Sequence, residues 1–331
     1  MSHGTISSLD FFSSALVNLK QSPVPVKNKI LKIDSHGDKH VKFACNDVVN
    51  GLYRVQLQLG SGSHGAVYKV IKMDTGGEYA LKITKATNDA GIKCLHTEYY
   101  LLNQFYWASG FPRVHNYIDL GYAKAMLVDL HGTDLQKMME KYPWICPHRA
   151  AQIAEAILAC LKKLHSIGWI HQDIKPDNIL RDNKDPNKFN LIDLGCAYRY
   201  RDEFLENHVK SATNVKPTGT WKYMTINQHC HYRTSRRDDL EQLAYTIIDI
   251  ANGLPWKNHT AKLYDIKIES EVPDICNGLP EVFAEFLNYA RNLGFYTKPK
   301  YSKWIHKFKR INEESYCSNW QGDCGWKSEN L

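Results

Sequence analysis

The stretch Trp169–Gly195 reads WIHQDIKPDNILRDNKDPNKFNLIDLG and alternates polar side chains with short apolar runs. The polar residues that could take part in a reaction are His171, Asp173, Lys175, Asn178 and Asp193. Short apolar runs on either side of a polar loop, followed by the turn signal Pro186-Asn187, are typical of strands joined by turns. The stretch therefore predicts a strand, a loop and a hairpin.

These polar residue types fit one kind of chemistry. Asp173 carries a carboxylate two residues before the ammonium of Lys175. Asn178 and Asp193 offer oxygen ligands, which suit a hard cation such as Mg²⁺. A base, a cation and two metal ligands are what phosphoryl transfer to a hydroxyl requires, because the base takes the proton and the charges neutralise the transferring group.

The spacing of these residues resembles the protein-kinase catalytic loop, H-R-D-L-x-x-x-N followed by D-F-G. Here the pattern stands as His171-Gln172-Asp173 through Asn178, and then as Asp193-Leu194-Gly195. Gln172 replaces the usual Arg and Leu194 replaces the usual Phe. An isolated H-x-D would be read as a solvated loop, but K-P-x-N and D-x-G at this spacing argue against that alternative.

Composition limits the other function classes. The chain has 331 residues, 43% of them hydrophobic, which allows one large or two modest domains. No apolar run approaches the ~20 residues that cross a bilayer, and no basic segment precedes an apolar one at the N-terminus. Nine cysteines without C-x-x-C pairs favour reduced thiols. We expect a cytoplasmic or nuclear protein without a membrane partner.

The net charge of +7 is compatible with acidic or phosphorylated partners and with nucleic acid. The usual nucleic-acid motifs are absent, so no nucleic-acid partner is expected.

A glycine-rich segment follows the first clear strand pattern. Before it, residues 1–50 are expected to form a poorly ordered extension, in which His40–Cys45 could form an extra strand. Alternation over Tyr53–Leu59 predicts a strand, and Gly60-Ser61-Gly62-Ser63-His64-Gly65 follows it. Glycines there let the backbone approach phosphates. The segment lies between two strands rather than before a helix, which speaks against a Rossmann unit and for a kinase glycine-rich loop.

Two charged residues extend the resemblance. Lys82 lies in the predicted strand Glu78–Ile83 and resembles the kinase lysine that binds the α- and β-phosphates. Glu98 lies in a helical pattern over Asp89–Trp107 and would be the ion-pair partner of that lysine. A solvated strand lysine is the alternative reading of Lys82, but its place on the next strand but one after the glycine-rich segment favours the functional one.

The resemblance implies a nucleotide site and a catalytic set. Met126–Val128 would lead to the adenine site, Asp129–Gly132 would form the hinge, and Val128 would guard the back pocket. The implied ATP-binding residues are Leu59, Gly60, Ser61, Gly62, Ser63, His64, Gly65, Val67, Ala80, Lys82, Glu98, Val128, Asp129, Leu130, His131 and Asp193. The implied catalytic residues are Asp173, Lys175, Asn178 and Thr220, with Asn178 and Asp193 holding Mg²⁺.

The second half of the chain narrows the resemblance. Pro147–Ile167 has the period of a buried helix, in which His165 is expected to be a core residue. Further on, G-T-x-x-Y at Gly219–Tyr223 and S-R-R-D-D-L-E at Ser235–Glu241 resemble the casein-kinase-one group, which includes tau-tubulin and vaccinia-related kinases. Thr225-Ile226-Asn227 stands where other kinases carry A-P-E. The resemblance covers about Tyr53 to Arg310 and does not settle the branch.

The implied fold is α+β and bilobal, with a small, mainly antiparallel N-lobe holding one key helix and a larger helical C-lobe. We place the kinase domain at residues 51–312, divided near residue 130, and a tail at 313–331. Protein substrates with Ser or Thr would be the partners. Thr220 would hydrogen-bond near Asp173 and Lys175, and Asp239 would brace the catalytic-loop backbone.

Two departures and a basic cluster shape the expected regulation. Leu194 can still pack beneath the helix that carries Glu98. Without the Arg that Gln172 replaces, activity is expected not to need a phosphorylated activation segment. Arg236, Arg237 and Lys222 could form an anion site that favours acidic or phosphorylated substrates, or Arg236 and Arg237 could only make internal salt bridges.

Other functions remain open at this point. A pseudokinase scaffold would keep the fold without transferring phosphate, and ATP turnover would separate it from an enzyme. A small-molecule kinase of similar fold is disfavoured by the G-T-x-x-Y and S-R-R-D-D patterns.

Overall fold

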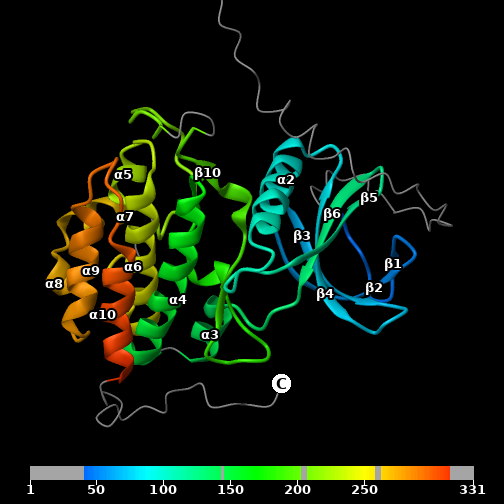
Figure 1. The fold of residues 1–331 in the computed structure, drawn as a ribbon, viewed down its shortest axis with the longest axis horizontal. Helices are drawn as coiled ribbons and strands as arrows, with labels where there is room; N and C mark the ends of the chain where they lie inside the picture. Colours follow the sequence, from blue (N-terminus) through cyan, green and yellow to red (C-terminus); the bar gives the residue numbers. More distant parts are fainter. Residues whose placement is uncertain (1–40, 143–144, 203–206, 258–261, 314–331) are drawn as a thin grey trace, which may run out of the picture.

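The computed structural model describes residues 41–142, 145–202, 207–257 and 262–313. The predicted extension up to residue 40 and the tail beyond residue 313 lie outside them. Figure 1 shows a sheet at one side and a larger bundle of helices at the other, with α2 (Asp89–Gln104) lying between them. The predicted bilobal α+β fold is therefore confirmed.

Six antiparallel strands form the N-terminal sheet in the order β1-β2-β3-β4-β6-β5. Their bounds are β1 (Val48–Val49), β2 (Tyr53–Gly62), β3 (Gly65–Lys72), β4 (Glu78–Lys85), β5 (Val114–Asp119) and β6 (Ala123–Asp129). In β3 every second side chain (Ala66, Tyr68, Val70) is buried. This period of two packs one sheet face into the N-lobe core, beside Val55 and Leu81.

The strand considered for His40–Cys45 is not present over the described residues 41–45. Side-chain bonds replace a ladder there: the Tyr68 hydroxyl donates to Val41 O at 3.0 Å and accepts from Phe43 N at 3.3 Å. A turn follows, closed by Ala44 N donating to Asp47 at 2.8 Å. Val41 and Val49, which precede the predicted boundary at residue 51, are buried in the N-lobe core.

The helical part is organised around two long helices that contact each other, α4 (Pro147–Ser166) and α6 (Arg236–Asn252). The predicted helix Pro147–Ile167 is thus found within one residue. The other helices are α3 (Leu135–Lys141), α5 (Ile226–His229), α7 (Leu263–Glu269), α8 (Val272–Ile275), α9 (Glu281–Arg291) and α10 (Tyr301–Glu313). No helix within the described ranges is long and apolar enough to cross a membrane.

Helix α6 is buried on every side from Asp238 to Ala251. A helix enclosed in this way is usually apolar all round, but α6 also carries the polar residues Asp238, Asp239, Glu241, Gln242, Thr246 and Asp249. Buried polar groups cost free energy unless they are hydrogen-bonded. The sequence of α6 therefore requires partners, and the loop quoted at the outset supplies several of them.

That loop has the predicted arrangement. Short strand β7 (Trp169–Ile170) precedes it, a 3₁₀ turn η1 (Pro176–Asn178) closes it, and β8 (Ile179–Arg181) pairs with β9 (Phe189–Leu191) as an antiparallel hairpin. A second 3₁₀ turn, η2 (Leu194–Cys196), follows, and β10 (Tyr198–Arg199) pairs back with β7. The hairpin register opposes Ile179 to Leu191, which brings the chain after β9 back to the loop.

Candidate active site

Asp173 lies at the centre of the candidate site and is only 7% exposed. Its carboxylate accepts from the backbone N–H of Thr220 at 2.7 Å and lies 3.0 Å from Nζ of Lys175. Lys175 Nζ also donates to the Thr220 hydroxyl at 2.7 Å. The predicted contacts of Thr220 with Asp173 and Lys175 are thus present. Thr220 thus holds the Asp173 carboxylate and the Lys175 ammonium close together.

Asn178 and Asp193 are brought together by the hairpin. Ile192 N donates to Asn178 O at 3.0 Å, which places Asp193 next to Asn178. Asn178 Nδ2 donates to Asp173 O at 2.9 Å. Because this fixes the amide nitrogen on Asp173, the amide oxygen is left to face another ligand. An amide oxygen beside a carboxylate is a donor set that fits Mg²⁺.

Lys82 joins the sheet to this site. Its Nζ forms an ion pair with Glu98 on α2 and another with Asp193 Oδ1 at 2.5 Å. The predicted Lys82–Glu98 pair is therefore present. Lys82 holds the pKa of Asp193 down at about 2, against the effect of burial. Burial raises the pKa of Glu98, and the pairing with Lys82 opposes that shift.

Asp239 on α6 braces the catalytic loop from below, as predicted. Its carboxylate accepts from His171 N at 2.7 Å and from Gln172 N at 2.8 Å. It also lies 2.7 Å from His165 Nε2, so His165 is a satisfied core residue. Gln172 has φ of 73°, a left-handed conformation that non-glycine residues adopt at a cost, and the Asp239 contact stabilises it.

Gln242 is a second brace that sequence reasoning missed. Its Oε1 accepts from Ile174 N at 2.9 Å, and its Nε2 donates to Gln172 O at 2.8 Å. The side chain of Gln172 in turn donates to the Thr234 hydroxyl at 2.5 Å. Gln242 lies three residues after Asp239, so the helical period could have placed both on one face of α6.

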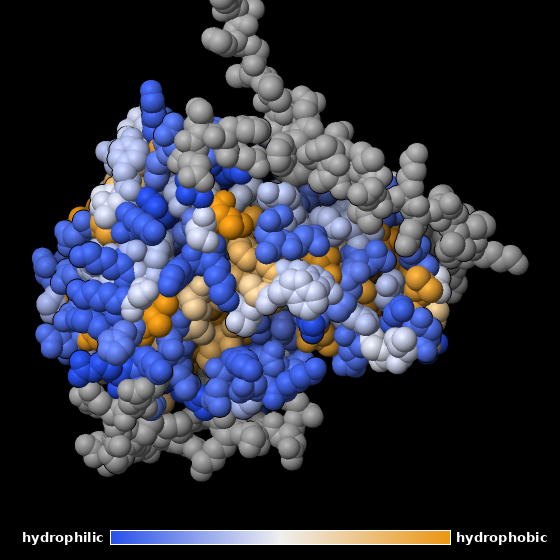
Figure 2. Space-filling model, in the orientation of Figure 1, coloured by the Kyte–Doolittle hydropathy of each residue, from blue (hydrophilic) through white to orange (hydrophobic). Residues whose placement is uncertain are grey.

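One face of the sheet carries four of the residues implied to bind ATP. The register opposes Val67 to Lys82 and Ala80 to Val128. Residues opposed on neighbouring strands share a face of the sheet, and so do alternate residues of one strand. All four side chains therefore lie on the face away from the N-lobe core. Figure 2 shows apolar surface gathered between the two lobes on the side that it displays.

The glycine-rich loop, residues 59–65, spans the end of β2 and the start of β3. Within the described part of the chain, no atom lies within 4 Å of a Cβ built on Gly60 or Gly62. These two positions therefore leave room for a phosphate chain. Gly65 has φ of 149°, and a Cβ there would lie 2.2 Å from Ile83 O, so this glycine is required by the fold itself.

The hinge leaves one backbone position open. Leu130 O accepts from Asn183 at 3.1 Å and Gly132 N donates to Arg181 O at 2.8 Å. The backbone N–H and C=O of His131, between them, have no partner among the described residues. This is the position from which a backbone can pair with adenine. Asp129 instead binds Arg113 at 3.2 Å and His115 at 2.7 Å, so its side chain has a structural role.

The basic residues considered for an anion site make internal contacts. Arg236 donates to Tyr296 O at 2.7 Å and lies 4.8 Å from the centre of the Tyr200 ring. Arg237 donates to Leu293 O at 3.4 Å. Lys222 pairs at 2.6 Å with the buried Asp249. Each of the three side chains thus makes an internal contact, and the Nε atoms of Arg236 and Arg237 have no hydrogen-bond partner among the described residues.

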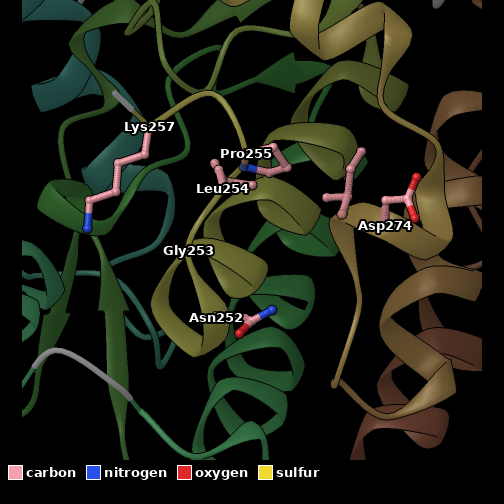
Figure 3. A pocket seen from close by; sticks show the side chains of 7 residues that line it. Asn252, Gly253, Leu254, Pro255, Lys257 and Asp274 are labelled. Atoms are coloured by element: carbon pink, nitrogen blue, oxygen red, sulfur yellow. The ribbon is translucent and has the colours of Figure 1, made fainter. Parts of the chain in front are cut away.

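A surface hollow of 320 Å³ lies elsewhere, at the C-terminal end of α6, and Figure 3 shows it. Its lining residues are Asn252, Gly253, Leu254, Pro255, Lys257, Asp274 and Ile275. Thirteen residues of helix separate Asn252 from Asp239, a distance of about 20 Å at 1.5 Å per residue. Lys257 and Asp274 extend in different directions in Figure 3, so the hollow lacks convergent polar groups.

Comparison with known proteins agrees with this geometry. Residues 53–273 match the family model described as the protein kinase domain, which is more than half of the chain.

The chain belongs to the protein kinase family.

Among curated proteins, this kinase is similar to casein kinase I homolog 1 of Schizosaccharomyces pombe, at 28% identity over 308 residues. The alignment covers 86% of this chain and 68% of that protein. The predicted enzyme class, a serine/threonine phosphotransferase, is confirmed by these matches. A kinase domain implies that ATP is the phosphoryl donor and that proteins are the acceptors.

Proposed function

We propose that this kinase belongs to the casein-kinase-one group and uses Mg²⁺-ATP to phosphorylate Ser and Thr of acidic or already phosphorylated proteins. We further propose that it does so without phosphorylation of its own activation segment. The observation that carries the proposal is the placement of Asp173, whose carboxylate is held by Thr220 N and Lys175 within hydrogen-bond reach.

In this mechanism the residues of the loop divide the work. Asp173 orients the acceptor hydroxyl and accepts its proton. Lys175, held by the Thr220 hydroxyl at 2.7 Å, places its charge next to the transferring phosphoryl group. Asn178 and Asp193 would hold Mg²⁺, which neutralises charge on the phosphates when bound. Lys82 holds the remaining phosphates and is itself oriented by Glu98.

Independence from phosphorylation of the activation segment, residues 193–226, is supported by the uncharged Gln172 and by contacts of the segment that need no phosphate. Gln172 is uncharged and donates to Thr234 at 2.5 Å, so no cation at this position awaits a phosphate. The segment is held instead by ring contacts and backbone bonds. Val209 N donates to Tyr200 O at 2.8 Å, and Ser211 N donates to the Tyr296 hydroxyl at 3.1 Å. The His208 ring lies 5.0 Å from each of the Tyr200 and Tyr296 rings.

Preference for acidic substrates is supported by the net charge of +7 and by the similarity to a casein kinase. An anion site formed by Arg236, Arg237 and Lys222 would use the N–H groups that their internal contacts leave available. Comparing rates on native and dephosphorylated casein tests this preference, and equal rates would remove the phosphorylated-substrate part of the proposal.

A reducing compartment, the cytoplasm or the nucleus, fits the state of the thiols. Among the described residues, Cys45, Cys94, Cys160, Cys196, Cys230 and Cys276 are free thiols. Cytosolic and nuclear proteins keep their thiols reduced.

The decisive experiment measures phosphate transfer from Mg²⁺-ATP to casein by the wild type and by Asp173→Ala. Loss of the base is expected to lower kcat by roughly 10²–10⁴-fold, while ATP affinity stays near that of the wild type. If neither protein transfers phosphate although both bind ATP, a pseudokinase scaffold replaces the enzyme as the function of this chain.

A further inference from the structure

Two cysteines distant in the sequence meet beside the Lys82 ion pairs. Cys94 lies on α2, one helical turn before Glu98 and on the same face. Cys196 ends the turn η2, three residues after Asp193. Each of the two thiols has the largest influence on the pKa of the other. The two elements that hold the partners of Lys82 thus also hold a pair of adjacent thiols.

The backbone around these thiols is closely packed. A Cβ built on Gly195 would lie 3.1 Å from Cβ of Cys94 and 3.4 Å from its carbonyl oxygen. The segment that follows Asp193 therefore rests directly on this turn of α2.

Both thiols are half-buried, so small reagents can reach them. The neighbouring Cys196 thiol lowers the pKa of Cys94 despite the burial of Cys94. The Cys94 thiol, together with burial, raises the pKa of Cys196. Cys94 is thus the more easily ionised thiol of the pair, and the thiolate is the reactive form.

Other cysteines have different surroundings. Burial raises the pKa of Cys160 and that of Cys276 to about 12, and Cys160 donates to Gly110 O at 3.3 Å. Cys230 contacts the Tyr264 hydroxyl at 3.0 Å. Cys230 is half-buried like Cys94 but faces a phenol, so it serves as a matched control.

We propose that Cys94 and Cys196 form a reversible disulfide when the protein meets hydrogen peroxide, and that this bond ties α2 to the segment following Asp193. The Cys94 thiolate attacks one peroxide oxygen, the O–O bond breaks, and hydroxide leaves, giving a sulfenic acid. The Cys196 sulfur then attacks that of Cys94, the S–O bond breaks, and the departing oxygen leaves as water with the Cys196 proton. The two sulfurs lose two electrons in total, and peroxide gains them.

The expected consequence is a loss of activity, which rests on the proposed function. Closing the bond draws η2 toward α2 and therefore shifts Asp193 relative to Lys82 and Glu98. A displacement of about 1 Å near a reacting centre can lower the rate by roughly 100-fold. The oxidised kinase should therefore lose at least about tenfold in kcat and recover it with dithiothreitol.

The test treats the full-length wild type, Cys94→Ser, Cys196→Ser and Cys230→Ser with hydrogen peroxide. Remaining thiols are then alkylated, and the proteins are digested without reduction for mass spectrometry. We expect a peptide pair joined through Cys94 and Cys196 in the wild type and in Cys230→Ser, and none in the other two variants. Activity after oxidation should fall only in the proteins that form the bond.

Peptide mapping and activity answer separate questions. Alkylated or over-oxidised Cys94 and Cys196 without a joined peptide in the wild type would overturn the proposal. A joined peptide without any change in kcat would overturn the inhibitory consequence and leave the modification site standing. If the untreated kinase transfers no phosphate, the proposed function fails, and the joined peptide still decides whether the disulfide forms.

Discussion

The catalytic loop and the glycine-rich loop serve the same reaction but are held very differently. In the catalytic loop, Asp239 and Gln242 of the buried helix α6 accept from the backbone N–H groups of His171, Gln172 and Ile174. The glycine-rich loop is exposed from Gly60 to Ser63. Beyond strand pairing, two side chains of the described residues outside the loop bind its backbone: Gln58 Nε2 donates to Gly60 O at 3.5 Å, and Asn88 Nδ2 donates to Ser63 O, at the tip, at 3.3 Å.

The difference corresponds to what each loop must do. A base and two metal ligands have to be in place when the substrate arrives, because positional error directly lowers the rate. A loop that covers a nucleotide has to open for entry and release, and such motions often limit turnover. Rigid bracing of the catalytic loop and a light tether on the glycine-rich loop are therefore complementary. Changes in the first should alter kcat, and changes in the second should alter KM for ATP.

Asp239→Asn should give the largest effect. One acceptor oxygen becomes an amide donor, so a buried N–H of the catalytic loop loses its partner, at a cost of about 1–3 kcal/mol. The loop shifts, and kcat should fall by roughly 100-fold. Casein phosphorylation and thermal unfolding measure the two effects.

Asp238→Asn is the matched control for that change. Asp238 is equally buried and is adjacent on α6, but it accepts from Thr225 Oγ1 and Ser235 N, both at 2.8 Å, rather than from the catalytic loop. It should lose stability with a much smaller change in kcat. Equal losses of kcat in both variants would mean that α6 supports the whole lobe and does not specifically position the loop.

Thr220→Val should give an intermediate effect. The substitution keeps the shape and the backbone N–H to Asp173 but removes the hydroxyl that accepts from Lys175. Hydrogen bonds to charged groups contribute about 1.5–3 kcal/mol, so kcat should fall by roughly tenfold or more. Thr220→Ser restores the hydroxyl and should recover most of the rate. A serine variant as slow as the valine variant would show that the methyl group, not the hydroxyl, matters.

Asn88→Ser should give the smallest effect, and it should change KM for ATP rather than kcat. Serine still caps the N-terminus of α2, where Asn88 now accepts from Gly91 N at 3.0 Å. It cannot reach Ser63, so the glycine-rich loop loses its tether. An exposed bond of this kind contributes about 0.5–1.5 kcal/mol, so KM for ATP should rise by roughly threefold while kcat stays constant. A fall in kcat at unchanged KM would contradict the division of roles between the two loops.

The sequence predicted the residues whose type and spacing are dictated by chemistry. Asp173, Asn178 and Asp193 lie within one short stretch, and the hairpin joins them as expected. Helix periodicity located α4, and strand alternation located the sheet. Asp239 was identified because it lies in the motif Ser235–Glu241, whose resemblance to the casein-kinase-one group implies a contact with the catalytic-loop backbone.

Contacts between distant segments were not predictable in the same way. The contacts of Asn88 and of the Cys94–Cys196 pair depend on how α2 packs, which local patterns do not encode, whereas the helical period could have placed Gln242 beside Asp239. The strand β1 has only two residues, too few for a periodic signal. The internal contact of Arg236 was not predictable either, because the sequence does not show that its guanidinium meets Tyr296 O, to which it donates at 2.7 Å.

The central claim is that protein contacts, and not a phosphate, hold the catalytic loop ready for reaction. The most direct test compares kcat on casein before and after phosphatase treatment, with mass spectrometry verifying that the activation segment is unphosphorylated. Because Gln172 offers no charge to a phosphate, we predict rates equal to within about twofold. A loss of about tenfold or more, restored by rephosphorylation, would contradict the account.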